Sequence, residues 1–83
     1  MSVLMYPLAT EKAIGKVEKE NVITYIVSNT ATKASIKEEF EKAFEVKVSR
    51  VNTENLPTNT KKAYIKLAKG FKASDVAVKL KLV

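Results

Sequence analysis

The residues of this 83-residue chain that are best suited to chemistry are basic side chains around Tyr64. Lys62 and Lys66 lie two positions before and after Tyr64, and side chains two positions apart on a β-strand point to the same face of the sheet. Ammonium groups bind phosphate oxygens and an aromatic ring stacks on a base, so this spacing indicates RNA binding. Lys61 belongs to the same basic patch, and Lys47 and Arg50 on the neighbouring predicted strand would extend it. The alternative is an exposed sheet face that lysines keep soluble and protect from edge pairing.

Three short polar side chains, Asn52, Thr53 and Asn55, stand near the end of the preceding predicted strand. They can donate hydrogen bonds to the phosphate and 2′-hydroxyl groups of RNA. The same residue types are equally common in turns at strand ends. The paired aromatic residues of a base-reading RNA motif are missing, so contacts with the RNA backbone and its shape are expected.

Catalytic and metal chemistry find little support in the composition. The chain has no cysteine and no histidine, which excludes disulfides and the usual zinc and copper sites, and removes the commonest general base and the best nucleophile. It has no glycine-rich phosphate loop, and the glutamates of residues 38–45 stand among lysines, as on a solvated helix face. We therefore expect no enzyme, no cofactor, no metal and no small-molecule substrate. The weaker alternative is a small phosphate-ester hydrolase that uses Arg50 and Asn52.

The positive charge of the chain is concentrated in its last third. The net charge is +6. Residues 1–60 hold eight basic residues and eight glutamates, whereas residues 61–83 hold seven lysines and one aspartate. The last segment therefore carries the whole excess of six, as expected for a localised contact with a polyanion. A solvated, lysine-rich surface is the alternative.

Three helices are predicted from apolar periodicity and capping residues. The first, residues 10–19, begins at a threonine, a typical N-cap. The second, residues 33–45, follows Thr32 and has Ser35 where a full capping box has Glu. The last begins after Ser74, its expected cap.

Three strands are predicted at Val22–Ser28, residues 46–55 and Lys61–Ala68, because these segments are rich in β-branched or alternating apolar residues. In the second of them the alternation of apolar and polar residues is broken before Val51, because Val46 and Val48 occupy even positions and Val51 an odd one. A β-bulge near Ser49 and Arg50 would explain this break, because one extra residue resets which side chains point inward.

Apart from the first helix, the order is β-α-β-β-α-β if Leu82 and Val83 supply a short terminal strand; residues before Pro7 are expected to form a tail. This is the ferredoxin-like, split β-α-β arrangement of the α+β class, preceded by a short N-terminal helix. We expect a single domain over residues 1–83, with an antiparallel sheet whose helices cover one face and whose other face meets a partner. The start does not resemble a signal peptide, and no stretch approaches the roughly 20 apolar residues that cross a bilayer. A cytosolic protein without membrane insertion is expected.

Several segments together resemble the ribosomal protein L twenty-three family, the universal large-subunit proteins at the exit of the nascent-chain tunnel. These segments are Pro7–Lys12, Thr32–Lys37, Phe44–Val48, Val51–Thr53 and Lys61–Leu67. They agree with the family in order and spacing and span nearly the whole chain. Each is a weak signal alone, and together in register they are a strong one.

The resemblance implies a structural protein that is bound to large-subunit ribosomal RNA and to neighbouring ribosomal proteins in the cytoplasm. In that family the surface around the Pro-x-x-Thr/Ser-Glu-Lys block docks factors that meet emerging chains. By that match Glu11 is the factor-docking candidate, with Ala9 and Thr10 beside it, although a glutamate at a helix start is by itself only a favourable partner of the helix dipole. The complete set of RNA-contact candidates is Lys12, Lys33, Lys37, Lys47, Arg50, Asn52, Thr53, Asn55, Lys61, Lys62, Tyr64 and Lys66.

One departure from the bacterial members of the family lies between the second and third predicted strands. Those members carry a long hairpin arm there, whereas residues 56–60 are an ordinary short loop. The chain therefore resembles the archaeal-type branch, with the signal recognition particle and the protein-conducting channel as expected docking partners in place of the bacterial chaperone. The alternative from another class is a small cytosolic domain with a regulatory or interaction role that oligomerises through its sheet edges without RNA.

Overall fold

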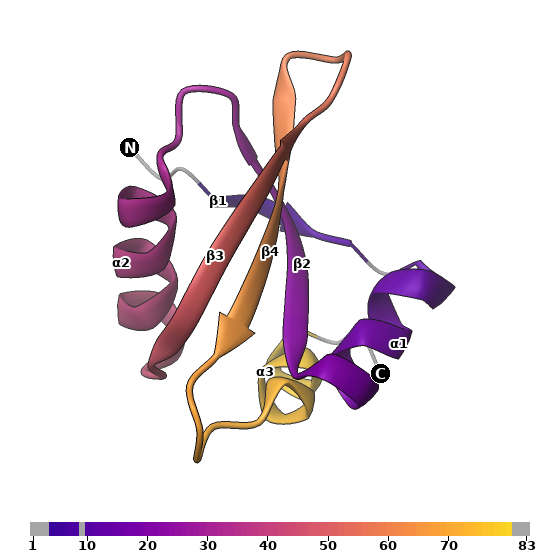
Figure 1. Ribbon diagram of the computed structural model, residues 1–83, viewed down its shortest axis with the longest axis vertical. Coiled ribbons are helices and arrows are strands. Elements are labelled where there is room, and N and C mark those ends of the chain that lie inside the picture. Colours follow the sequence, from indigo (N-terminus) through magenta and orange to yellow (C-terminus); the bar gives the residue numbers. More distant parts are fainter. Residues whose placement is uncertain (1–3, 9, 81–83) are drawn as a thin grey trace.

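The computed structural model describes residues 4–8 and 10–80, in which four strands form one antiparallel sheet. In chain order the elements are β1 (Leu4–Pro7), α1 (Glu11–Glu20), β2 (Val22–Ser28), α2 (Lys33–Phe44), β3 (Val48–Asn55), β4 (Thr60–Leu67) and α3 (Ala73–Lys79). The spatial order of the strands is β1-β2-β4-β3. Helices α2 and α1 lie on opposite sides of the strand bundle and α3 lies at one end of it (Figure 1). The predicted α+β class and split β-α-β sheet are confirmed.

Strand β1 is the element that the sequence did not reveal, since the residues before Pro7 were expected to form a tail. It pairs with β2 in antiparallel fashion, with Leu4 opposite Val27 and Pro7 opposite Tyr25. This is the sheet edge at which a split β-α-β fold places its last strand. The N-terminal segment therefore supplies the fourth strand. The terminal strand predicted at residues 82–83 lies outside the described residues.

The first two helices begin at the threonines that the sequence indicated. The Thr10 hydroxyl oxygen accepts a hydrogen bond from the Ala13 N–H at 3.2 Å. At α2 the Thr32 hydroxyl accepts from the Ser35 N–H at 3.1 Å, and the Ser35 hydroxyl accepts from the Thr32 N–H at 3.0 Å. The capping box of α2 is thus complete, because the serine oxygen reaches the backbone that a glutamate would reach.

Helix α3 does not use its predicted cap. It begins at Ala73, and Ser74 lies inside its first turn. The cap comes from Asn21, whose Oδ1 accepts from the Ala73 N–H at 2.6 Å and whose Nδ2 donates to the Phe71 carbonyl at 2.8 Å. Asn21 also ends α1 in a left-handed conformation with φ 58°. One side chain therefore joins the end of α1 to the start of α3, and no local sequence pattern could indicate a cap from 52 residues away.

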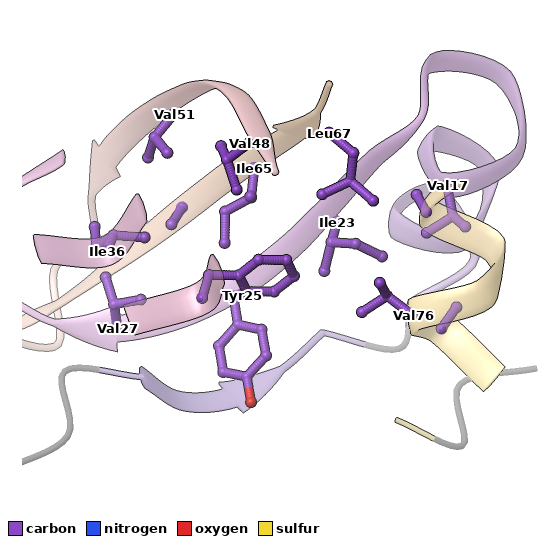
Figure 2. Packing of buried hydrophobic residues seen from close by; sticks show 14 of the residues in the cluster. Val17, Ile23, Tyr25, Val27, Ile36, Val48, Val51, Ile65, Leu67 and Val76 are labelled. Carbon is purple, nitrogen blue, oxygen red and sulfur yellow. The ribbon is translucent and has the colours of Figure 1, made fainter. Parts of the chain in front are cut away.

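The core lies between one face of the sheet and helices α2 and α3 (Figure 2). Tyr25 packs edge-on against Phe40, with 6.3 Å between ring centroids. Fully buried side chains from β2, α2, β4 and α3 surround them, among them Ile23, Val27, Ile36, Ile65 and Val76. Burying these apolar side chains is the main favourable contribution to folding. It also fixes which face of each strand points inward.

The opposite face of the sheet is less exposed to solvent than predicted. On β2, Thr24 and Ile26 should face away from the core, yet each is only 3% exposed. Helix α1 covers this end of the sheet: Val17 joins the core, while Ala13 lies close to Thr24 on the opposite face. Helices α2 and α3 do cover one face as expected, but α1 wraps the β2 side and leaves β4 and β3 as the open part.

The hairpin of β3 and β4 confirms two predictions. The register shifts between Val48 and Arg50, so both Val48 and Val51 are buried and the predicted bulge is present. The link is short: the Leu56 N–H donates to the Thr60 carbonyl at 3.0 Å, and Asn59 turns the chain with φ 63°. No helix among the described residues has the length and apolar character needed to span a membrane.

Candidate nucleic-acid interface

The open face of the sheet is built from alternate residues of two paired strands. Lys62, Tyr64 and Lys66 of β4 share the face opposite to the buried Ala63, Ile65 and Leu67. Across the ladder, Glu54, Asn52 and Arg50 of β3 stand directly opposite them. The bulge sets this register, because without it Arg50 and Asn52 would exchange faces with their neighbours.

Tyr64 is held at the centre of this face by charged neighbours. The Lys16 ammonium lies 5.6 Å from the ring centroid and the Lys62 ammonium lies 6.0 Å from it, both within the range of cation–π attraction. The Tyr64 hydroxyl donates a 3.3 Å hydrogen bond to Glu54. Lys16 in turn pairs with Glu20, one helical turn further on, at 3.4 Å. The ring is half-buried, so one part of its surface remains accessible.

Two hollows flank Tyr64 and Lys16, which belong to the walls of both. The first lies between the start of α1 and the sheet and is lined by Leu8, Thr10, Lys12, Ala13, Lys16, Thr24, Lys62 and Tyr64. The second lies between the end of α1 and the hairpin and is lined by Lys16, Glu20, Val22, Arg50, Asn52, Tyr64 and Lys66. Among the predicted RNA contacts, six therefore meet on one face: Lys12, Arg50, Asn52, Lys62, Tyr64 and Lys66.

Lys16 was not among the predicted contacts. Sequence periodicity placed it on the first helix, but periodicity alone could not show that α1 would lie against the open face. The signal that could have indicated this is the burial of β2 on both faces, because seven residues without a polar alternation suggest cover on both sides.

A second group of candidates lies on the α2 side of the sheet. Thr53, Asn55 and Lys61 are on the same face of the sheet as the buried Val51 and Ala63, toward the β3–β4 turn. The Lys61 ammonium donates to the Ala31 carbonyl at 3.0 Å, close to the start of α2, where Lys33 lies. The predicted grouping of Lys61 with the open-face lysines is therefore wrong, because adjacent strand residues point to opposite faces.

The remaining candidates sit apart from both hollows. Lys37 is exposed on α2, and Lys47 is exposed just before β3, where its carbonyl accepts from the Ala68 N–H at 2.8 Å. Glu11 is exposed at the start of α1. Thr10, its neighbour, is also exposed but belongs to the lining of the first hollow. Ala9 lies outside the described residues. The described residues include no cluster of three metal-ligating side chains.

The arrangement offers fixed positive charge, amide and hydroxyl groups, and one aromatic ring on a sheet face bordered by a helix. It is a split β-α-β domain with a basic open face. A profile of the family described as Ribosomal protein L23 matches residues 2–75. The chain belongs to this family, as the sequence segments indicated.

Curated relatives agree with the family profile. The chain is 44% identical over 79 residues to the large ribosomal subunit protein uL23 of Methanothermobacter thermautotrophicus, covering 95% of this chain and 92% of the relative. It is 43% identical to the uL23 protein of Trypanosoma brucei brucei, covering 98% of this chain and 49% of the relative, and 48% identical to that of Tetrahymena thermophila, covering 99% and 55%. The chain thus spans about half the length of the last two relatives. The family is one of structural ribosomal proteins, so the prediction of a non-enzyme is confirmed.

Proposed function

We propose that this chain binds large-subunit ribosomal RNA near the exit of the polypeptide tunnel, as a cytoplasmic, ribosome-bound constituent with RNA and neighbouring ribosomal proteins as partners. The observation that carries the proposal is the composition of the open face. Five cationic side chains line its two hollows, Lys12, Lys16, Arg50, Lys62 and Lys66, whereas Glu20 is the acidic residue among the described lining. Such a surface neutralises phosphates and releases their counterions.

The test is protein–RNA crosslinking in native large subunits, read out by residue. We expect crosslinks at Lys62, Tyr64 and Lys66, together with cosedimentation of the chain with large subunits. A subunit structure in which β4 points into solvent with no nucleotide near it would contradict the proposal. So would a free protein that dimerises and ignores ribosomes.

A docking role at the start of α1 is the second part of the proposal. Glu11 is exposed in the first turn of α1, where a carboxylate is available to a basic partner surface. Ala9 and Thr10 would complete the contact, and the signal recognition particle and the protein-conducting channel are the proposed partners.

This role is tested by Glu11→Lys against Glu18→Lys, a matched charge reversal at another exposed position of the same helix. Glu11→Lys should reduce cosedimentation of the targeting particle with ribosomes while the chain stays in the large subunit. Equal binding by the two variants would remove Glu11 from the docking surface.

A further inference from the structure

The two hollows beside Tyr64 differ in chemistry, and the difference suggests what each accepts. The first brings the Lys12, Lys16 and Lys62 side chains around a small depression, and none of the described residues that line it is acidic. The hydroxyl of Thr24, in the wall of this hollow, is buried and has no hydrogen-bond partner among the described residues. A buried hydroxyl normally has a partner, and a bound polar group would supply one. Positive charge with an unpartnered hydroxyl suits a phosphate group.

The second hollow is larger and of mixed character. It combines the apolar side chain of Val22, the ring of Tyr64 and the amide of Asn52, and it has Glu20 beside its cations. The carboxylate of Glu20 makes it the poorer of the two sites for a phosphate. A ring face with a nearby side-chain amide is the usual environment for an unpaired base, which stacks on the ring and hydrogen-bonds along its edge.

We propose that the two hollows together bind one unpaired nucleotide of RNA. Its phosphate lies among the lysines of the first hollow, and its base lies in the second hollow against Tyr64, with the Asn52 amide at the edge of the base. Lys16 and Tyr64 form the shared wall and contact the sugar between them. The inference rests on the proposed function and deepens it, because it identifies unpaired RNA as the form that gains base contacts on the open face.

Discrimination against duplex RNA follows from the geometry. A base can enter the second hollow only when it is free of its pairing partner, because Tyr64 and Asn52 need its face and its edge. Duplex RNA can still meet the exposed cations through its phosphates. The open face should therefore bind both forms, with an additional contribution from the single strand that depends on the ring.

The experiment measures binding of the full chain to a labelled single-stranded oligoadenylate of about eight nucleotides and to a blunt RNA duplex long enough to stay paired, comparing each variant with the parent on each ligand at the same fixed salt. Tyr64→Leu should weaken single-strand binding about 5- to 150-fold, the usual range for loss of one stacked base, and leave duplex binding nearly unchanged. Tyr64→Phe keeps the ring and should retain the preference. Lys69→Gln removes a charge from an exposed loop outside both hollows and should weaken both ligands equally.

Equal effects of Tyr64→Leu on strand and duplex, or no effect on either, would overturn the inference. Asn52→Ala provides an independent arm if Tyr64→Leu lowers the melting temperature, and it too should weaken the single strand alone. The two proposals fail differently. A chain that cosediments with large subunits but does not discriminate strand from duplex refutes only the nucleotide site, whereas a chain that binds neither RNA nor ribosomes refutes the proposed function.

Discussion

Single residues on the sheet differ sharply in how well their polar atoms are satisfied. Thr24 is 3% exposed and its hydroxyl oxygen is buried without a hydrogen-bond partner among the described residues. Leaving a buried hydroxyl unpaired costs about 1–3 kcal/mol. Such a residue lowers the stability of the free protein, and it stands beside the hollow to which we assign the phosphate.

Replacing that hydroxyl should therefore stabilise the fold. We predict that Thr24→Val raises the free energy of unfolding by about 1 kcal/mol, because valine keeps the β-branched shape and removes the unpaired oxygen. Urea denaturation of the free chain measures the change. Thr53→Val, at a half-buried strand position, is the control and should stay within about 0.5 kcal/mol of the parent. A loss of stability in Thr24→Val would mean that the hydroxyl is hydrogen-bonded in solution.

Tyr25 gives the fold a pH dependence in the alkaline range. Burial raises the pKa of the Tyr25 hydroxyl above its usual value of 10.0, because the phenolate would lose hydration in the core. The folded state then holds its proton where the unfolded chain releases it, so the stabilisation is fully present below the usual pKa and is lost as pH rises above it. We predict that Tyr25→Phe has a shallower fall in stability above about pH 10. Equal slopes in denaturation measured across that range would contradict this assignment.

At the scale of elements, the sequence predicted those parts of the fold that local patterns determine. The strand at Val22–Ser28, the caps at Thr10 and Thr32, and the bulge before Val51 all follow from side chains close together in the chain. Strand β1 does not, because four residues that end in proline become a strand only when the edge of β2 is available to pair with them.

The cap of α3 could not be predicted either, because the residue that supplies it is distant in the sequence. The role of this cap can be tested. Asn21 makes two hydrogen bonds to the start of α3 and holds a left-handed backbone. We predict that Asn21→Gly lowers the free energy of unfolding by about 1–2 kcal/mol, because glycine adopts the left-handed backbone without strain but cannot supply the cap. Asn21→Ala should lower it by about 1 kcal/mol more, because alanine is strained there.

Asn59→Gly is the matched control for this prediction. Asn59 has nearly the same backbone angle, φ 63°, in the exposed β3–β4 turn, but it caps none of the helices in the described part of the chain. Thermal or urea denaturation compares the variants. A cost for Asn21→Gly no larger than that for Asn59→Gly would show that the link between α1 and α3 contributes little.

At the scale of the whole molecule, the sequence predicts the excess of positive charge but not which faces of the domain carry it. The excess of basic residues after position 60 is plain in the sequence, yet alternation along β4 sends Lys61 to the α2 side and Lys62 to the open face. Helix α1 adds Lys12 and Lys16 to the open face from a segment with no net charge excess. The sequence thus identified most of the candidate residues, while only the packing of α1 against the sheet groups them.

The two basic groups lie on opposite sides of a molecule about 19 Å across in its shortest dimension. One straight RNA segment cannot reach Lys62 and Lys66 on the open face and also Lys33 and Lys37 on α2. If both groups contact phosphate, the domain lies between two RNA segments. Neutralising different phosphates makes additive contributions to the salt dependence of binding.

We therefore predict that Lys62→Gln with Lys66→Gln reduces the log–log salt slope for ribosomal RNA binding by about 1.4–1.8, as two lost phosphate contacts require. Lys33→Gln with Lys37→Gln should reduce it by a similar amount, and all four together by the sum. Affinities measured at several salt concentrations give the slopes. If the variant with all four substitutions had the slope of either pair alone, the two groups would have to contact the same phosphates. The sheet lies between the groups and does not allow this. The assignment of one side of the domain to RNA would then have to be withdrawn.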